Sequence, residues 1–284
     1  MACPNSHSVR MDRRSSWSVA VSNKVGTNAW ASSGGELRRQ DRVRLIGQAL
    51  LTRISALPGR LRARLRFSDA ASRRIDLSAI RLPDSPVALR AGEHARSLSE
   101  PWLFYHCLRT YVWGAMLAQS DRIKFDHELL FVASALHDLG LTDAHKCQEH
   151  NCTCFAVEGA RAAHRFVAAI GWENERRDRL AEAISLHLNV RVGLQHGPEA
   201  HLLHEGAALD VIGARVREIG PTAVTAVLKE YPRLGLKEQM VAEMKEQARI
   251  RPRSRAAFLV GLGFVGLIRS AALENAEWEE SLDT

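Results

Sequence analysis

"LLFVASALHDLGLTD", residues Leu129–Asp143, sets an apolar run directly against two polar side chains, His137 and Asp138. The length and composition of the run are typical of a buried helix. A carboxylate is costly to bury in its charged form unless a cation or hydrogen-bond donors compensate it. Gly140, just after the pair, is compatible with a helix end. We therefore expect a buried helix that ends on His137 and Asp138 beside a compensating cation.

Apolar residues recur with helical spacing from about residue 86 onward, and alternating runs of the strand type are nearly absent. The pairs Gly171-Trp172 and Gly220-Pro221 have the composition of helix ends. The pattern predicts an all-α fold. The expected helices span residues 86–97, 101–119, 126–138, 155–171, 174–188, 199–218, 221–231, 236–249 and 253–273.

Basic residues are concentrated near the N-terminus. The formal net charge is +7, and residues 1–67 hold 13 Lys and Arg against 3 Asp and Glu. Residues 1–36 are rich in Ser, Asn and Gly, which predicts disorder. Residues 37–66 place apolar side chains at helical spacing between arginines. Such a helix could bind nucleic acid or an anionic membrane, but it lacks interleaved aromatic residues. We expect it to pack one face on the body of the protein.

Three regions follow from this organisation: a largely disordered basic arm over 1–67 with one amphipathic helix, a main domain over 68–250, and a C-terminal helix over 251–284 that packs on it. The most apolar stretch, Ala256–Ile268, is 13 residues, too short to cross a bilayer. No secretory signal is evident. Five cysteines, three of them within eight positions, fit a reducing compartment. We expect a cytoplasmic protein without a transmembrane segment.

Two further patterns have structural rather than functional interpretations. "GLGFVG", Gly261–Gly266, matches the dinucleotide-binding pattern but follows no strand. Its glycines are expected to let the C-terminal helix pack closely on the bundle. The aromatic residues Trp102, Tyr105 and Trp113 are expected in the core, although one or two of these rings could also line the pocket beside His106.

Two more polar side chains interrupt apolar helices: His106 in "EPWLFYHCLRTYVWG" and Asp210 in "GAALDVIGARV". With His137 and Asp138 they would supply two imidazoles and two carboxylates, a set suited to Zn²⁺, Fe²⁺ or Mn²⁺. Four protein ligands would leave open positions for water and substrate. We expect one divalent metal ion, Zn²⁺ before Fe²⁺ or Mn²⁺. In the alternative interpretation, His106 caps a polar pocket and Asp210 pairs with a nearby arginine.

The order His106, His137-Asp138, Asp210 resembles the HD-domain metallohydrolase superfamily, and several segments resemble its cyanamide hydratase-like branch. The resemblance covers about residues 100–245. It implies an HD-domain helical bundle with His106, His137, Asp138 and Asp210 as metal ligands. The segments that carry it are "HCLRTYVWG" (His106–Gly114), "LLFVASALHDLGLTD" (Leu129–Asp143), "CFAVEGARAAHRFV" (Cys154–Val167), "LAEAISLHLNV" (Leu180–Val190), "LHEGAALDVIGAR" (Leu203–Arg215) and "LKEYPRLGLKEQM" (Leu228–Met240).

The resemblance implies catalytic roles for three further residues. Arg109 would orient a carboxylate or the substrate. His187 lies where the branch has a histidine near the metal and would move protons. Glu158 matches an acidic position on a helix that faces the site. For each of them a structural role, in an ion pair or a satisfied helix, stays open.

The chain departs from the family pattern at two positions. Phe155 stands where two-metal HD phosphodiesterases carry a further histidine, which favours a single metal ion. Ala156 stands where the cyanamide hydratase-like branch often has glutamate, which puts the hydration of a nitrile in doubt.

The leading expectation for function is a metal-dependent hydrolase or hydratase that acts on a small molecule, such as the nitrile cyanamide. The first alternative is a phosphohydrolase acting on a nucleotide or phosphate monoester, with Arg109, Lys146 or Arg191 as available cations. An apolar pocket would favour the nitrile and a basic rim the phosphate. The second alternative is a non-catalytic binding module that docks through its arm. The expected partner is a small-molecule substrate, and a homo-oligomer is left open.

"HKCQEHNCTC", His145–Cys154, supplies two histidines and three cysteines within ten residues. Such groups can bind Zn²⁺, although structural zinc sites usually combine two separated pairs of ligands. We expect a polar surface loop with incidental cysteines, placed where it could cover the pocket.

Overall fold

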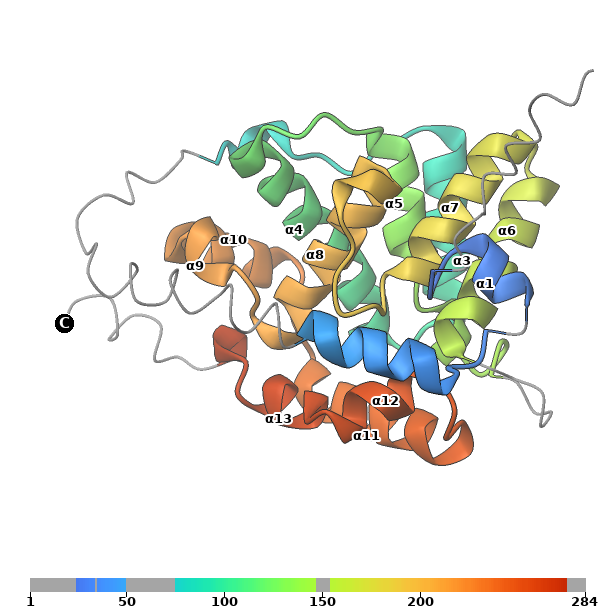
Figure 1. Cartoon of the computed structure of the whole chain (residues 1–284). Coiled ribbons are helices and arrows are strands. Elements are labelled where there is room, and N and C mark those ends of the chain that lie inside the picture. The colour runs from blue at the N-terminus through green and yellow to red at the C-terminus, as the bar shows by residue number, and fades with distance from the viewer. Residues whose placement is uncertain (1–23, 34, 50–74, 147–153, 275–284) are drawn as a thin grey trace, which may run out of the picture.

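The computed structural model describes residues 24–33, 35–49, 75–146 and 154–274. Every regular element in this part of the chain is a helix, which confirms the predicted all-α class. Figure 1 shows the helices gathered in one bundle, with α11 and the shorter α12 and α13 along one side. The longer helices are α3 (Pro86–Leu98), α4 (Pro101–Asp121), α5 (His127–Leu136), α6 (Phe155–Ala169), α7 (Asn174–Leu186), α8 (Pro198–Ile212), α10 (Pro221–Glu230) and α11 (Leu236–Ile250).

Several helix starts follow local sequence signals. The Ser85 side chain accepts a hydrogen bond from the Ala88 N–H at the start of α3, where Pro86 occupies the first turn. Asp126 caps α5 in the same way by accepting the Leu129 N–H. These caps satisfy backbone donors that have no partner inside the helix, so the sequence fixes where both helices begin.

Two of the predicted helices are interrupted. The expected helix 199–218 ends at Ile212, because Gly213 takes the left-handed conformation (φ 68°), and α9 (Val216–Ile219) follows. The expected helix 253–273 is divided at Gly263 (φ 89°) into α12 (Arg255–Gly261) and α13 (Phe264–Arg269). The expected close packing of these glycines is wrong, since a Cβ on Gly261, Gly263 or Gly266 would meet no described atom within 4 Å.

Close backbone crossings position the polar residues. Gly206 on α8 lies against the Thr110 carbonyl of α4 with no room for a Cβ. Gly140, in the 3₁₀ turn η2 (Leu139–Leu141), lies equally tightly against the Phe155 carbonyl at the start of α6. Any side chain at either glycine would push the helices apart. The first crossing joins α4 to α8, and the second holds the turn after Asp138 against α6.

Two apolar clusters form the interior. The larger is built from α3 to α10 and encloses Trp113 and Leu130. The smaller joins distant parts of the sequence: Trp30, Leu45, Phe155, Met240 and Ala256 belong to it. The segments that flank the main bundle therefore share a core with α6 and α11.

Residues 24–33 differ from the predicted disorder. They form α1 (Asn28–Ser32), in which Trp30 is 4% exposed beneath the Arg255 guanidinium, whose carbon lies 5.0 Å from the ring centroid. The Asn28 side chain donates to the Asp178 carbonyl of α7 at 2.9 Å. Burial of an indole and these long-range contacts order the segment. Residues 1–23 lie outside the described part of the chain.

Residues 39–49 are helical, as expected, and pack against the C-terminal segment. Leu45 is buried, whereas Val43 is 70% and Ile46 41% exposed, so the packed face is narrow. The Leu37 N–H donates to the Arg253 carbonyl at 3.2 Å. In Figure 1 this unlabelled blue helix lies beside α12 and α13. Residues 50–66 of the predicted helix lie outside the described residues.

None of the described helices is both long and apolar enough to span a bilayer.

Candidate metal centre

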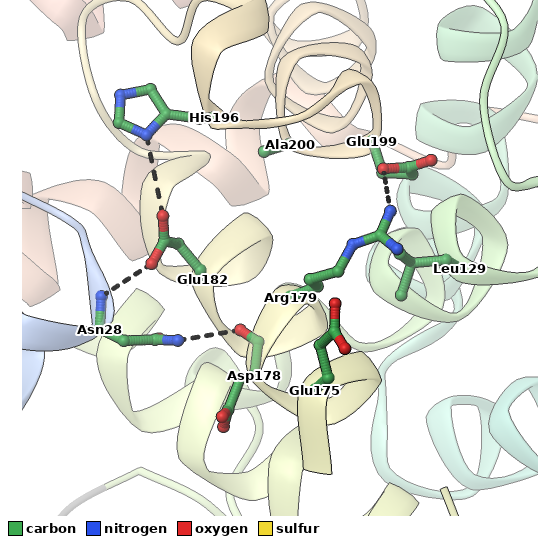
Figure 2. A pocket seen from close by; sticks show the side chains of 9 residues that line it. All are labelled: Asn28, Leu129, Glu175, Asp178, Arg179, Glu182, His196, Glu199 and Ala200. Carbon is green, nitrogen blue, oxygen red and sulfur yellow. Dashed lines mark hydrogen bonds and ion pairs between the residues drawn. The ribbon is translucent and has the colours of Figure 1, made fainter. Parts of the chain in front are cut away.

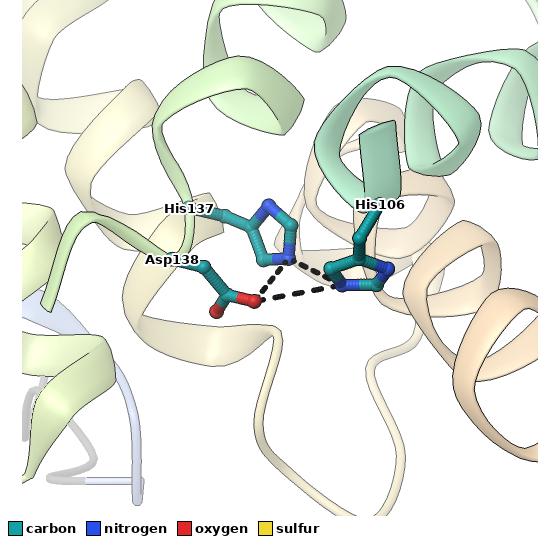
Figure 3. A group of neighbouring side chains, drawn as sticks. All are labelled: His106, His137 and Asp138. Carbon is teal, nitrogen blue, oxygen red and sulfur yellow. Dashed lines mark hydrogen bonds and ion pairs between the residues drawn. The ribbon is translucent and has the colours of Figure 1, made fainter. Parts of the chain in front are cut away.

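His106, His137 and Asp138 converge from three places in the fold (Figure 3). His106 projects from the middle of α4, His137 ends α5, and Asp138 begins the η2 turn. One ligand atom from each lies within 4.8 Å of the others, and all three residues are buried. The group could therefore hold a metal ion.

Hydrogen bonds fix which ring nitrogens are available. His137 Nδ1 lies 2.8 Å from the Ser134 carbonyl, and His106 Nδ1 lies 2.7 Å from Asp210 Oδ2. Carbonyl and carboxylate oxygens only accept, so each Nδ1 carries the proton. The two Nε2 atoms, 3.2 Å apart, are the ones left to bind a ligand. Histidines that bind metals are commonly oriented in this way through the other nitrogen.

Asp138 completes the group. Its Oδ2 lies 3.2 Å from His137 Nε2 and 3.5 Å from His106 Nε2. Its Oδ1 is buried and accepts no hydrogen bond from any described residue. A buried carboxylate oxygen without a donor is costly. Two imidazole nitrogens that a metal ion could take over from a proton, beside a carboxylate with one oxygen lacking a donor, are a donor set that a divalent cation would satisfy.

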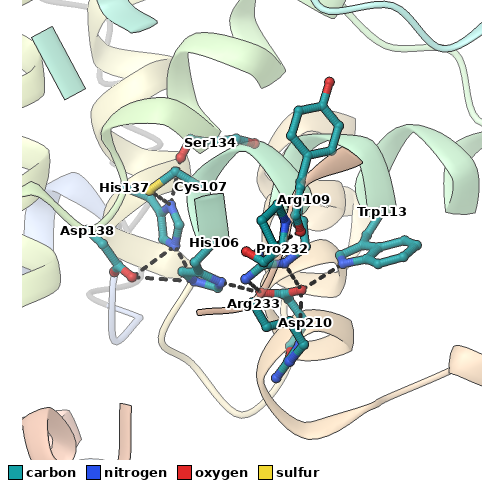
Figure 4. Close-up of polar contacts among 11 residues, drawn as sticks. His106, Cys107, Arg109, Trp113, Ser134, His137, Asp138, Asp210, Pro232 and Arg233 are labelled. Atoms are coloured by element: carbon teal, nitrogen blue, oxygen red, sulfur yellow. Dashed lines mark hydrogen bonds and ion pairs between the residues drawn. The ribbon is translucent and has the colours of Figure 1, made fainter. Parts of the chain in front are cut away.

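Asp210 lies beside this group but is not part of it (Figure 4). Besides the bond to His106, its Oδ1 accepts from Arg109 Nε at 2.8 Å and from Trp113 Nε1 at 2.8 Å. Arg233 Nη1 also lies 3.4 Å from Oδ1 and donates to the Asp210 backbone carbonyl at 2.8 Å. The structure thus places Asp210 behind His106, where it orients the ring, although the resemblance implied a ligand.

Arg109 is fully buried and committed to protein acceptors. Its Nε and Nη2 form a two-pronged ion pair with Asp210 at 2.8 and 3.0 Å. Its Nη1 donates to the carbonyls of Tyr231 and Pro232. Of the two roles that the resemblance implied, this geometry suits orientation of a carboxylate and leaves no face toward a substrate.

His187 follows α7 and faces Asp138 from the other side. Its Nδ1 donates to the Ile184 carbonyl at 2.6 Å, which leaves the Nε2 lone pair 3.6 Å from Asp138 Oδ1. Burial, reinforced by the charge of His137, lowers the pKa of His187 to about 3. The ring is therefore neutral near pH 7, with the Nε2 lone pair directed toward Asp138.

Glu158 is not brought to this group. It lies in the first turn of α6, where its carboxylate forms an ion pair with Arg161 at 2.8 Å. A negative charge in the first turn stabilises a helix. The structure gives Glu158 the structural role that the sequence had left open.

Charge in the metal-free group is shared between imidazole and carboxylate. Burial alone would lower the pKa of His137, but the Asp138 carboxylate overcomes it and raises that pKa to about 10. The pKa of His106 is also raised, because Asp138 and Asp210 outweigh its burial. Burial opposes ionisation of Asp138, yet the neighbouring imidazoles hold its pKa well below the usual value. A metal ion would replace the proton that this group otherwise retains.

A cavity of about 620 Å³ opens onto the group and includes His187 in its wall. Most of its lining is apolar, from α8, α11, α12 and α13. Ile46 and Ala49, from the N-terminal arm, also line it. None of the aromatic residues Trp102, Tyr105 and Trp113 is among the described lining residues, so these rings do not contribute to the pocket beside His106.

Sequence reasoning missed three polar residues here. Trp113 was expected only as core, yet it donates to Asp210. Arg233 belongs to a stretch that resembles the HD family, but nothing in its local pattern indicated a contact with Asp210. His204 lines the cavity, and its Nδ1 donates to the His187 carbonyl at 2.9 Å. The available signal was a histidine within the largely apolar sequence of α8.

The histidine and cysteine segment 145–154 is described only at its ends. Cys154 is buried, with its sulfur 3.5 Å from Arg255 Nη2. Residues 147–153 lie outside the described part of the chain. The polar surface loop expected for this segment therefore stays a prediction.

A second cavity, about 450 Å³, lies between α1, α7 and α8 (Figure 2). Several of its charged residues already pair with one another, as Arg179 does with Glu199 at 3.0 Å and His196 with Glu182 at 3.8 Å. It contains none of the three converging residues. The candidate metal ligands therefore face the larger of these two cavities.

Known proteins provide no independent assignment of this site, since no family model and no curated protein sequence matches the chain.

Proposed function

We propose that this protein is a metal-dependent hydrolase or hydratase of the HD-domain type that activates water against a small molecule. The observation that carries the proposal is the convergence of His106, His137 and Asp138 on a cavity wall. Their order along the chain, on separate elements of an all-α bundle, supports the HD-domain assignment. One divalent ion is proposed, with Zn²⁺ first and Fe²⁺ or Mn²⁺ as alternatives.

The protein's own residues would hold the ion through two Nε2 atoms and the Asp138 carboxylate. When bound, a divalent ion supplies Lewis acidity, which activates water and polarises the group to be attacked. Asp210 would keep His106 oriented, and Arg109 would keep Asp210 ionised. Phe155 lines the cavity with its ring centroid 6.0 Å from that of His187, which supports a single ion.

His187 is proposed as the proton carrier. Its neutral ring presents Nε2 to the space beside Asp138, within the same cavity. In the addition of water to a nitrile, oxygen bonds to carbon while His187 takes one proton and delivers it to nitrogen. The second hydrogen moves to nitrogen as the imidic acid rearranges to the amide, so the atoms of water and nitrile balance.

The surroundings favour an uncharged substrate over a phosphate. Binding of phosphate requires cations that face the reaction centre. Arg109 already forms an ion pair with Asp210. Lys146 lies 3.4 Å from Glu243 and does not line the cavity. Arg191 is exposed and does not line the cavity either. Arg215 does line it, but Glu218 and Asp121 lie within 2.9 Å of its guanidinium.

Metal content tests the proposal. Protein purified without a metal-affinity tag is analysed by elemental mass spectrometry as wild type and as Asp138→Ala. Wild type is expected to hold about one equivalent of Zn, Fe or Mn, and the variant to hold none. Circular dichroism establishes that both are folded.

Each outcome is decisive. A well-folded wild type that takes up no metal even after reconstitution overturns the proposal and favours a binding module. Metal that survives in Asp138→Ala assigns it elsewhere, with the segment 145–154 as the next place to examine. Loss of metal in the variant justifies a screen of nitriles against phosphate esters.

A further inference from the structure

We infer that the substrate is an uncharged molecule with an apolar body of several carbon atoms, rather than cyanamide or a phosphate ester. This inference rests on the proposed function, because it assumes that the reacting group lies beside His106, His137 and Asp138. It concerns the rest of the cavity, which the reaction itself does not explain.

The cavity is larger than a small polar nitrile requires. Its volume of about 620 Å³ lies within the range that takes a drug-sized ligand. A substrate of three heavy atoms would leave most of this space to water against apolar walls. An apolar body would displace that water and gain free energy from the burial of its surface.

The walls beyond the histidines are apolar. Of the 24 described residues that line the cavity, 16 are aliphatic, aromatic or methionine. Val211 on α8 faces one side, and Met240 and Met244 on α11 face another. Methionine side chains adapt to ligands of varied shape. Such walls recognise hydrocarbon surface and do not recognise charge.

The polar residues on those walls are already engaged. Asn189 donates to the Val25 carbonyl at 2.7 Å and accepts from Arg255 at 3.0 Å. Glu205 lies 3.4 Å from Arg215, so the two charges face each other. The groups that remain to bind a polar function are those around His106, His137, Asp138 and His187, together with Nε2 of the neighbouring His204. This places one polar end of the substrate at the histidines.

The solvent-exposed part of the cavity lining is apolar as well. Three lining residues are substantially exposed: Ile46 at 41%, Leu262 at 36% and Leu267 at 45%. They come from the N-terminal helical segment, the end of α12 and α13. An entrance lined by exposed aliphatic side chains is typical of a binding site for an apolar ligand. It would be costly for an ionic substrate to cross.

The test uses the full chain and two series of probes. Linear hydroxamic acids, from acetohydroxamic to octanohydroxamic acid, are titrated into metal-loaded protein by calorimetry, with alkyl phosphates of matched length alongside. Linear alkanols, from ethanol to octanol, are titrated into metal-free protein. Affinity in the hydroxamate and alkanol series is expected to rise about fourfold per methylene. The phosphates are expected to bind at least about tenfold more weakly than the matched hydroxamates.

A substitution in the cavity lining tests where the apolar end of the ligand binds. Ala208 lines the cavity from α8 and is not one of the three converging residues, so Ala208→Phe should shorten the space available. We expect about a tenfold loss of affinity for octanohydroxamic acid, with acetohydroxamic acid changed less than about twofold. Ala169→Phe, at the exposed end of α6 and outside the cavity, is the matched control.

The outcomes separate this inference from the proposed function. Bound metal with affinities that do not depend on chain length, or with phosphates preferred, overturns the inference and leaves the metal centre standing. If the protein takes up no metal, the proposed function fails and the alkanols decide alone: a rise with length supports an apolar ligand, and a flat series overturns it. Should Ala208→Phe fail to fold, the wild-type series still carries the decision.

Discussion

Asp138 and Asp210 are two buried carboxylates on either side of His106, and the protein treats them differently. Asp210 is fully buried and accepts hydrogen bonds from His106, Arg109 and Trp113. Asp138 is 3% exposed, and its Oδ1 accepts no hydrogen bond from the described residues. Both oxygens of Asp210 therefore have hydrogen-bond donors, whereas one oxygen of Asp138 has none among the described residues.

The difference identifies Asp138 as the carboxylate that a bound cation could compensate. Arg109 cannot lose its proton, so it compensates Asp210 at any ordinary pH. Asp138 faces imidazoles, which carry charge only when protonated. The imidazoles beside Asp138 can therefore give up a proton to a metal ion. The Arg109 guanidinium beside Asp210 keeps its charge and holds that carboxylate in place.

The largest expected effect is on stability, from Asp210→Ala. It leaves the Arg109 guanidinium buried without a counterion, which should lower the free energy of unfolding by about 3–5 kcal/mol. Urea denaturation of metal-free protein measures it. Asp84→Ala, at an exposed position, should change the value by less than about 0.5 kcal/mol. A loss below about 1 kcal/mol for Asp210→Ala would mean that Arg109 finds another partner and the contrast between the carboxylates is wrong.

The second effect is on metal affinity as a function of pH. The pKa of His137 is raised to about 10, so metal-free protein holds that proton throughout the neutral range. Metal must displace it, and affinity should therefore rise with pH, by about tenfold per unit for each proton released. Competition titrations with a chelator between about pH 6 and pH 8 measure the slope. Affinity that is constant over this range would show that no proton is displaced.

Much of the candidate metal site could be predicted, because its residues are polar side chains within apolar stretches of sequence. A histidine or carboxylate inside an apolar helix is visible in the sequence, and His106, His137 and Asp138 were identified on that basis. The structure brings these three together. Asp210 was equally visible as a buried polar residue, and its pairing with Arg109 had been an open alternative. Whether it binds a metal or a histidine depends on which ring nitrogen of His106 faces it, which only tertiary structure decides.

Features that depend on distant partners could not be predicted. Trp30 lies in a segment whose composition predicts disorder, and it is buried because Arg255, far along the chain, lies over its ring. Glu158 was assigned to the site by position in a motif, but its nearest charge is Arg161, one turn away. The divisions at Gly213 and Gly263 follow from a left-handed backbone that glycine permits but does not require.

A smaller effect is expected from Trp113→Phe, which removes one donor from Asp210 and replaces the indole with a smaller aromatic ring. Hydrogen bonds to charged groups contribute about 1.5–3 kcal/mol, and Arg109 remains in place, so we expect a loss near the lower limit. Urea denaturation measures it against Trp172→Phe, whose indole lies 4.3 Å from the Arg176 guanidinium and makes no contact with Asp210. Equal losses in the two variants would assign the effect to lost volume and not to the hydrogen bond.

The smallest expected effect on folding comes from Asp138→Asn in metal-free protein. The wild-type carboxylate is buried with one oxygen lacking a donor, so its removal recovers part of a desolvation cost. That gain offsets the lost attraction between the carboxylate and the protonated imidazoles, which holds the pKa of Asp138 below its usual value. The imidazoles of His106 and His137 can then lose their proton, which the Arg109 guanidinium next to Asp210 cannot do. We expect the free energy of unfolding to change by less than about 1 kcal/mol, while the rise in melting temperature that metal gives wild type disappears. Urea denaturation with a chelator and thermal melts with added Zn²⁺ measure the two quantities. A loss as large as that of Asp210→Ala would mean that Asp138 is as much a part of the folded core as Asp210, and that its uncompensated oxygen does not mark a metal site.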